Sequence, residues 1–317
     1  MTKRGSFGLH QLHDLISTGG SFTVSTARDL GLTRGVDQYR RETGRLGRPH
    51  HGLRTTAEPA DLLDRARMAG LLLPPGGAIG RRTAADLMEV DPRLPSERGI
   101  DLDVECLVPL GATPLRRPGI RSYVTDLEPD EFDTGLGFPL TTPERTLADL
   151  LRWLPAHMAL AVADRMARRK LVDLDGVEAI LDRWHGHRFV RQARRLLDAV
   201  EPKSESYGES WLRLRLLDAG FPRPEAQIPI LDGGLEIYRL DLGWPDLRIA
   251  VEYDGEEFHG SPEQQQHDAD RRRDMFERHR WNVVGVGKAH VLGPTLLLEH
   301  GVGEMLGLRP RITHRSW

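Results

Sequence analysis

One hairpin-like segment constrains the fold of this chain more than any other part of its sequence. Residues 235–255 read LEIYRLDLGWPDLRIAVEYDG, in which two runs with alternating apolar side chains flank a Trp-Pro-Asp-Leu step. Alternation with a period of two is typical of strands that bury one face, and proline favours the second position of a tight turn. The segment therefore predicts a β-hairpin that turns at Pro245 and Asp246.

The same hairpin carries carboxylates where apolar side chains would also fit. A two-residue loop places Leu242 opposite Ile249 on an apolar face. It places Asp241 diagonal to Glu252 on the other face, at a Cα separation of about 7–8 Å. A slip by one residue would scatter the acids to opposite faces and break the apolar face, so both patterns favour this register.

Clustered carboxylates need a positive charge among them, because they repel one another and resist burial. Arg239, which this register places opposite Glu252, is one candidate and would form a cross-strand ion pair. A divalent cation, Mg²⁺ or Mn²⁺, is the other, because such ions prefer oxygen ligands and can activate water against a phosphodiester. We favour the cation, with Asp241 and Glu252 as metal ligands.

Composition is typical of a soluble globular protein. The 317 residues are 39% hydrophobic and 29% charged, and this length favours two or three domains. No apolar run approaches the roughly 20 residues that cross a bilayer, and the N-terminus lacks the apolar core of a signal peptide. We therefore expect a cytoplasmic protein with no membrane partner. The single cysteine, Cys106, excludes an internal disulfide and a multi-cysteine metal site.

The N-terminal segment is basic and has the pattern of a helix-turn-helix. Residues 1–54 hold nine Lys or Arg against four Asp or Glu. A helix over 9–16, a second helix capped by Ser25, a tight turn and a third helix from Thr33 fit that motif, and residues 45–56 fit a wing. The side chains expected to bind DNA are Arg34, Gln38, Arg40, Arg41, Arg45 and Arg48. The alternative is a three-helix bundle whose basic surface binds nothing.

The rest of the chain predicts an α+β multidomain fold. One helix start stands out at Thr142, a cap residue followed by a proline and a glutamate. A polar stretch near residue 200 marks a boundary. We predict a winged helix-turn-helix at 1–56, a middle α+β and helical region at 57–200, and a C-terminal domain at 204–317. In that last domain a helix, three strands, a long charged helix, a strand and a final helix predict a mixed sheet flanked by helices.

The C-terminal domain resembles a known nuclease family. The resemblance rests on Ser206 and Glu209, Arg239 and Asp241, the run VEYDG at 251–255, His259, and Arg273 with Asp274. Together these residues look like the Vsr-like branch of the PD-(D/E)XK nuclease superfamily, a group of bacterial proteins. The resemblance implies a restriction-endonuclease-like sheet and a bacterial source.

The same resemblance implies a catalytic role for five residues. Asp241 and Glu252 would bind the metal ion, and Glu209 would be the helix acid that completes the site. His259 would act as a base or orient water. Asp254 stands where many relatives in the superfamily carry a lysine.

Several of these residues have plain structural alternatives. Glu209 fits the third position of a capping box with Ser206. His259 fits an ordinary loop histidine. The arginines at 271–273 fit a solvated helix face, or ion pairs within the helix, better than phosphate clamps.

The upstream part resembles the AbiEi-like antitoxins and regulators. The segments that carry this likeness are the winged-helix region, GRRTAADLMEV at 80–90 and GFPLTTPERTLADLL at 137–151. The resemblance implies DNA binding by the N-terminal segment and a scaffold role for the middle region.

Two functions follow from these patterns. The first is a Mg²⁺-dependent DNA endonuclease whose N-terminal domain binds duplex DNA. The alternative is a non-cleaving DNA-binding regulator of the antitoxin type with a degenerate nuclease fold, and Gly285 favours it because relatives have a basic residue there. A protein that binds no nucleic acid is a third hypothesis. The DNA sequence, a protein partner or homodimer, and the pathway stay open.

Overall fold

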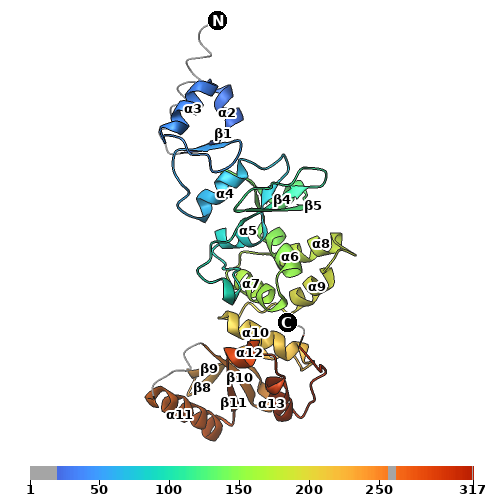
Figure 1. The fold of residues 1–317 in the computed structure, drawn as a ribbon. Coiled ribbons are helices and arrows are strands. Elements are labelled where there is room, and N and C mark those ends of the chain that lie inside the picture. Colours follow the sequence, from blue (N-terminus) through green and yellow to red (C-terminus); the bar gives the residue numbers. More distant parts are fainter. Residues whose placement is uncertain (1–19, 256–261, 316) are drawn as a thin grey trace. The chain divides into compact units, whose positions relative to one another are not determined.

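The computed structural model describes residues 20–255, 262–315 and 317. The chain divides into two compact units, Met1–Thr146 and Leu147–Trp317 (Figure 1). Each unit combines helices with a sheet that contains both parallel and antiparallel strand pairs. This architecture confirms the predicted multidomain α+β class, whereas the finer division near residues 56 and 200 stays a prediction.

The first described elements of the N-terminal unit are two short helices beside a two-stranded sheet. In chain order they are β1 (Ser21–Thr23), α2 (Val24–Asp29), α3 (Arg34–Glu42) and β2 (Leu53–Thr55). β1 pairs antiparallel with β2, and a further bridge joins Gly47 to Thr55. Their shared core comprises Phe22, Ala27, Leu32 and Leu46. The helix predicted over 9–16 lies outside the described residues.

Threonine caps begin both helices. The Thr33 side chain accepts a hydrogen bond from the N–H of Val36 at 3.4 Å, so the third predicted helix starts where the sequence indicated. Thr23 caps α2 by accepting from the N–H of Thr26 at 3.0 Å. The predicted cap, Ser25, was wrong because Thr23 already has the extended backbone of a cap residue and Ser25 lies inside the first turn.

A five-stranded sheet and two α-helices follow in this unit. The elements are α4 (Leu62–Gly70), β3 (Ala78–Ile79), α5 (Arg81–Leu87), β4 (Val104–Pro109), β5 (Ile120–Thr125), β6 (Phe132–Asp133) and β7 (Leu140–Thr141). The strand order is β5-β4-β3-β7-β6. The pairs β4–β5 and β3–β7 are parallel, and the other two pairs are antiparallel.

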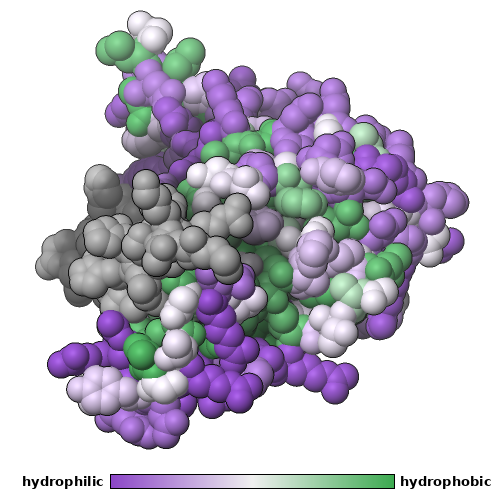
Figure 2. Space-filling view, turned by 90° about the horizontal axis from the view of Figure 1, so that it is seen from above, coloured by the Kyte–Doolittle hydropathy of each residue, from purple (hydrophilic) through white to green (hydrophobic). Residues whose placement is uncertain are grey.

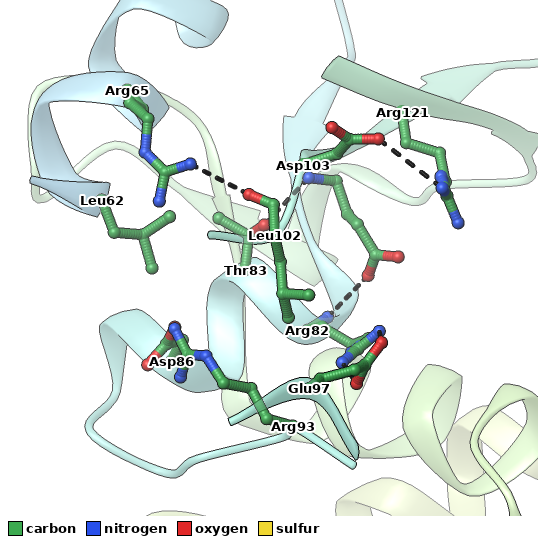
Figure 3. Close-up of a pocket in the computed structure, with 11 residues that line it drawn as sticks. Leu62, Arg65, Arg82, Thr83, Asp86, Arg93, Glu97, Leu102, Asp103 and Arg121 are labelled. Carbon is green, nitrogen blue, oxygen red and sulfur yellow. Dashed lines mark hydrogen bonds and ion pairs between the residues drawn. The ribbon is translucent and has the colours of Figure 1, made fainter. Parts of the chain in front are cut away.

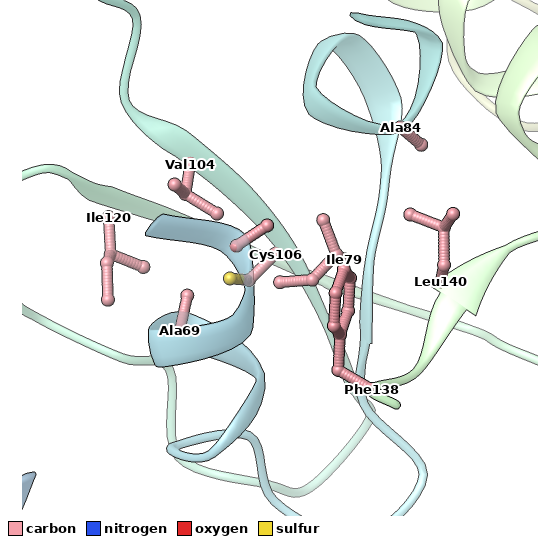
Figure 4. Packing of buried hydrophobic residues seen from close by; sticks show 9 residues of the cluster. Ala69, Ile79, Ala84, Val104, Cys106, Ile120, Phe138 and Leu140 are labelled. Carbon is pink, nitrogen blue, oxygen red and sulfur yellow. The ribbon is translucent and has the colours of Figure 1, made fainter. Parts of the chain in front are cut away.

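The core of this sheet is apolar and closely packed (Figure 4). Ile79 and Cys106 from neighbouring strands pack with Ala69 of α4 and with Phe138. A Cβ on Gly70 would lie only 2.7 Å from the Cβ of Phe138, so the end of α4 approaches the core closely because it is glycine. Burial raises the pKa of the Cys106 thiol to about 12, so this cysteine behaves as a small apolar side chain.

Helix α6 (Pro143–Trp153) crosses from the first unit into the second. The Thr142 side chain accepts a hydrogen bond from the N–H of Arg145 at 3.2 Å, which confirms the predicted helix start. The Arg145 side chain is fully buried and pairs with Glu131. This ion pair holds the first turn of α6 to the segment that precedes β6.

The second unit begins with helices and continues into a four-stranded sheet. Its elements are α7 (Ala156–Arg168), α8 (Leu174–Arg183), α9 (Val190–Asp198), α10 (Tyr207–Asp218), β8 (Glu225–Asp232), β9 (Leu235–Trp244), β10 (Ile249–Asp254), α11 (Pro262–His279), β11 (Asn282–Gly287), α12 (Lys288–Leu292) and α13 (Leu297–Leu306). The strand order is β11-β10-β9-β8, with β10 and β11 parallel and the other pairs antiparallel. No helix among the described residues is long and apolar enough to cross a membrane.

The turn between β9 and β10 is longer than the predicted two-residue loop. A 3-10 turn at Pro245–Leu247 is followed by Arg248, which has a left-handed backbone with φ of 55°. Ile249 therefore pairs with Trp244, and the predicted pairing of Ile249 with Leu242 was wrong by two residues. The sequence does not reveal the left-handed residue, because arginine rarely adopts that conformation.

The two-residue shift also changes the pairing that the prediction gave to the acids. Val251 pairs with Leu242 and the ladder ends there, where the Asp241 carboxylate accepts a hydrogen bond from the N–H of Tyr253. The same shift moves Arg239 away from its predicted position opposite Glu252.

Helix α10 lies at the centre of the second unit, and nine of its twelve residues are buried. Arg213 and Arg215 are two positions apart, which is about 200° around a helix, so they point in opposite directions. Arg213 donates to Asp164 of α7 at 2.6 Å, and Arg215 donates to Glu299 of α13 at 2.6 Å. Helix α10 thus joins the helices before it to the elements after it in one buried core.

Candidate nucleic-acid interface and acid cluster

Helix α3 presents basic and amide side chains, and none of its nine residues is buried. At about 100° per residue, Arg34, Gln38 and Arg41 share one face of the helix. Arg40 projects from a different side, near Tyr39, whose side chain is 56% exposed. The structure therefore brings together three of the four residues predicted on α3.

The basic residues of this region differ in their partners. Arg41 lies 3.4 Å from Asp37, and Gln38 donates to Glu42 at 2.8 Å. Within the described part of the chain, no carboxylate pairs with the other predicted residues: Arg34, Arg40, Arg45 and Arg48. Their charges are therefore available to phosphate groups.

A bidentate ion pair anchors α3 to β2. Arg54 Nε donates to Asp37 Oδ1 at 2.6 Å, and Arg54 Nη2 donates to Asp37 Oδ2 at 2.7 Å. Arg54 is buried and also donates to the Leu53 carbonyl at 2.8 Å. The hydrogen bond from Arg54 lowers the pKa of Asp37 below its ordinary value. Because α3 buries no side chain, this charged pair fastens the helix where apolar packing does not.

A second candidate site lies where the paired part of β9 and β10 ends. Here the Asp241 carboxylate accepts a hydrogen bond from the N–H of Tyr253 at 2.8 Å. Burial, followed by the nearby carboxylates of Glu209 and Glu252, raises the pKa of Asp241 to about 7. The strand pattern predicted that Asp241 and Glu252 meet, and the nuclease resemblance added Glu209. We refer to Glu209, Asp241 and Glu252 as the acid cluster.

Glu209 enters the acid cluster from the first turn of α10. The Ser206 side chain accepts from the N–H of Glu209 at 3.2 Å, and the Glu209 carboxylate accepts from the N–H of Glu205 at 2.9 Å. These bonds resemble the predicted capping box, except that Glu209 bonds the residue before the cap. Glu209 therefore has a structural role in starting α10, whether or not it has a chemical one.

Gln227 is a member of this neighbourhood that sequence reasoning missed. Its amide donates to Glu209 Oε2 at 2.8 Å, and it lies opposite Asp241 at a point that the β8–β9 pairing skips. Its φ of 56° is left-handed, which costs a residue other than glycine about 1–3 kcal/mol. A strained conformation in mid-strand therefore turns this amide toward the acids. No local sequence pattern signals it.

Two arginines of α11 pair with the acids of β10. Arg271 donates to both carboxylate oxygens of Glu252, at 3.0 and 2.7 Å, and Arg272 donates to Asp254 at 3.0 Å. Glu252 is only 4% exposed, so Arg271 compensates its charge inside the protein. The predicted solvated face was wrong for both arginines, because α11 turns them toward the sheet.

The other basic residues near the cluster have different partners. Arg273 is 62% exposed and lies 3.4 Å from Asp270, so for this arginine the solvated face is confirmed. Arg239 pairs with Glu236 at 2.6 Å and not with Glu252. The alternative of an Arg239–Glu252 pair was wrong because the hairpin register differs by two residues.

A divalent cation does not fit the acid cluster in this arrangement. Arg271 takes both oxygens of Glu252, and backbone N–H groups donate to Asp241 and Glu209. In the part of the chain that the structure describes, no three His, Cys, Asp or Glu side chains are grouped to hold a metal ion. The metal and catalytic roles of these acids and of Asp254 stay predictions, and His259 lies outside the described residues.

The first unit contains a charged cleft of about 80 Å³ between α4, α5 and β4 (Figure 3). Its ion pairs are Arg82 with Glu97, Arg93 with Asp86, and Arg121 with Asp103. At its base the buried carboxylate of Glu105 accepts from the N–H of Arg82 and from the hydroxyl of Tyr123, both at 2.9 Å. The charges in this cleft are balanced within the protein, so it is a structural network rather than a site for a charged ligand.

The surface adds one general observation. Hydrophilic side chains cover most of the face shown in Figure 2, with apolar residues scattered between them.

Three comparisons with known proteins bear on these sites. Residues 68–199 match the family model of the AbiEi antitoxin C-terminal domain, which confirms the resemblance predicted for the middle region. Two curated relatives are the uncharacterized proteins Rv2248 and MT2308 from two strains of Mycobacterium tuberculosis. Each is 34% identical over 146 residues, which cover 46% of this chain and 54% of the relative. This chain thus spans about half the length of the curated relatives it matches.

One solved structure is also similar, the crystal structure of the RV2827C protein from Mycobacterium tuberculosis. The sequence identity is 16% and the TM-score is 0.41, over 70% of this chain and 84% of that one.

Proposed function

We propose that this chain is a DNA-binding regulator of the antitoxin type, in which α3 is the recognition helix and the segment from Arg45 to β2 is the wing. The match of residues 68–199 to an antitoxin domain supports the class. The observation that carries the proposal is the exposed α3 face formed by Arg34, Gln38 and Arg41, on a helix fastened to β2 by charge.

The chemistry of these side chains suits a duplex. Arginine can donate two hydrogen bonds to guanine, and glutamine can bond adenine through its amide, when a helix lies in the major groove. Arg45 and Arg48, which follow α3, are suited to phosphates, whose contacts give position and salt-dependent affinity. We therefore assign base contacts to Arg34 and Gln38 and phosphate contacts to Arg45 and Arg48.

Fluorescence anisotropy of the full chain with a mixed-sequence duplex tests this proposal. The logarithm of the binding constant falls linearly with the logarithm of the salt concentration. Arg45→Ala makes this slope shallower by about one released counterion. Arg67→Ala, an exposed arginine on α4, is the matched control and leaves both affinity and slope unchanged. An Arg34→Ala/Arg45→Ala/Arg48→Ala variant that binds like the natural chain would overturn the proposal.

A metal-dependent DNA endonuclease is the second candidate, and the convergence of Asp241 with Glu209 and Glu252 favours it. In this arrangement it requires Arg271 to leave Glu252. Incubation of supercoiled, linear and mismatched DNA with the protein and Mg²⁺ or Mn²⁺ tests it. Intact DNA in every case, or equal cleavage by Asp241→Asn, would reject this candidate and leave DNA binding by α3 unaffected.

A further inference from the structure

We infer that Arg271 and Arg272 of α11 are the built-in counter-ions of the acids on β10, and that the acid cluster accepts a divalent cation only when Arg271 is withdrawn. This inference concerns a different site from the proposed DNA interface and does not depend on it. Three observations support it: the contacts that hold Arg271, the glycine that lies against Arg272, and the way β10 divides its side chains between two helices.

Arg271 is held from two sides. Its guanidinium donates to both oxygens of Glu252 and lies 5.5 Å from the ring centroid of Tyr238. The Tyr238 hydroxyl donates to Asp274, one turn further along α11, at 3.1 Å. A charged group that is fixed by a carboxylate and an aromatic face is an integral part of the fold rather than a solvated side chain.

Gly285 provides the space for the second counter-ion. It lies beside Glu252 in the parallel pairing of β10 with β11. A Cβ at this position would overlap Asp254 Oδ2 and the Arg272 guanidinium. The absence of a side chain at Gly285 of β11 therefore leaves room for a positive charge from α11. The nuclease resemblance would place a basic residue of the strand itself at this position.

Strand β10 divides its side chains between the helices on the two faces of the sheet. Glu252 and Asp254 reach the arginines of α11. Tyr253, between them, packs edge-on against Trp211 of α10, with ring centroids 6.4 Å apart. Met275 of α11 is fully buried in the core that includes Ala250. The apolar docking of α11 therefore delivers both guanidinium groups at once.

Competition for one carboxylate explains why the cation is excluded. A guanidinium and a divalent ion cannot both occupy the oxygens of Glu252. The guanidinium has the advantage because it is part of the protein and does not dissociate. Without it, the buried Glu252 and the half-buried Asp241 are neighbouring acids that lack the positive charge of Arg271, a situation that favours protonation or a bound cation. Replacement of Arg271 therefore creates cation affinity.

Titration of Mn²⁺ into the metal-free full-length protein near pH 8, followed by calorimetry, tests this inference. The natural chain and Arg271→Lys, which keeps the charge, show no saturable binding. Arg271→Ala shows saturable Mn²⁺ binding, at least about tenfold tighter than any residual binding by the natural chain. Arg273→Ala removes the exposed neighbour on the same helix and behaves like the natural chain. Addition of Asp241→Asn to Arg271→Ala abolishes the gained affinity.

Circular dichroism and thermal unfolding confirm that each variant is folded, and Mn²⁺ raises the unfolding temperature of Arg271→Ala alone. If Arg271→Ala does not fold, Arg271→Gln replaces it, because the amide still bonds Glu252 without a charge. Equal Mn²⁺ binding by the natural chain and the Arg271 variant overturns the inference. A folded Arg271 variant without Mn²⁺ affinity overturns it as well.

Discussion

The carboxylate of Asp37 on α3 and the guanidinium of Arg54 on β2 share two hydrogen bonds of 2.6 and 2.7 Å. This pair connects the helix that carries the candidate DNA-binding face to β2, the strand in the proposed wing. Its geometry is bidentate, with the arginine buried and its other amino group bonded to the backbone of its own strand. The position of α3 therefore depends on this charged pair.

Asp37→Asn is expected to destabilise the N-terminal unit by about 1 kcal/mol, because an amide offers Arg54 one neutral acceptor oxygen in place of two charged ones. The lowered pKa of Asp37 fixes the pH dependence. Its stabilisation is fully present above the ordinary carboxyl pKa of about 4 and is lost as the pH falls through the lower folded value. Urea unfolding at neutral and acidic pH measures this, with exposed Asp29→Asn as the control. A difference that persists at acidic pH contradicts the assignment.

Asp241→Asn should have the opposite pH dependence. The folded pKa of Asp241 is raised to about 7, so the folded protein holds a proton that the unfolded chain releases near pH 4. Stability contributed by the neutral form is present at acidic pH and is lost as the pH rises from about 4 to about 7. Asparagine removes that loss and stabilises the protein at pH 8 by about 2–4 kcal/mol.

Chemical unfolding across this pH range tests the prediction for Asp241. Asp246→Asn, in the exposed turn after β9, is the control and should leave the pH profile unchanged. An Asp241→Asn profile that is parallel to that of the natural chain between pH 4 and 8 would show that Asp241 titrates normally.

Two helical glycines should respond differently to alanine. A Cβ on Gly208 in α10 would overlap the ring of Tyr253, whereas a Cβ on Gly301 in α13 meets nothing within 4 Å. Alanine favours a helix by about 0.5–1 kcal/mol over glycine, so Gly301→Ala should stabilise the protein. Gly208→Ala should destabilise it by about 1–3 kcal/mol, because a rigid ring in a packed core cannot yield. The unfolding temperatures of both variants test this prediction. Equal shifts in unfolding temperature would mean that α10 and β10 are less closely packed than the structure shows.

The buried ion pair between Asp164 and Arg213 should be costly to break from one side. Asp164→Ala leaves the guanidinium of Arg213 buried without its carboxylate and is expected to destabilise the second unit by about 3–5 kcal/mol. Asp182→Ala, which breaks an exposed pair with Arg194, should cost at most about 1 kcal/mol. Denaturant unfolding compares them. An Asp164→Ala/Arg213→Met double variant that is more stable than Asp164→Ala alone would identify the unpaired charge as the cause.

Local pattern was sufficient to predict most of the second unit. The period-two segment gave β9 with the observed limits. At the end of the first unit, the predicted helix start at Thr142 was also confirmed. The register failed because it depends on Arg248, whose left-handed backbone lengthens the turn. In the first unit, β3, β6 and β7 have two residues each, which is too short for any periodic signal, so their sheet could not be predicted.

Partners distant in sequence were the least predictable part of the candidate sites. Asp241 and Glu252 were found because they lie in the alternating patterns of two adjacent strands, whereas Glu209 came from the nuclease resemblance. Arg271 was not assigned to Glu252, because the rotation of α11 about its axis is set by Met275 and the sheet core, not by its own sequence. Gln227 was missed for a related reason, since a strained backbone leaves no trace in composition.

Helix α10 has a consequence for how such a chain can be divided or inherited. The antitoxin-like match ends at residue 199, yet the last matched helices depend on α10, because Arg213 neutralises Asp164 on α7. On its opposite side α10 reaches α13 through Arg215. A gene rearrangement that replaced α10 and the C-terminal sheet with another module would leave the carboxylate of Asp164 buried without its arginine. The two parts are therefore expected to be transmitted together.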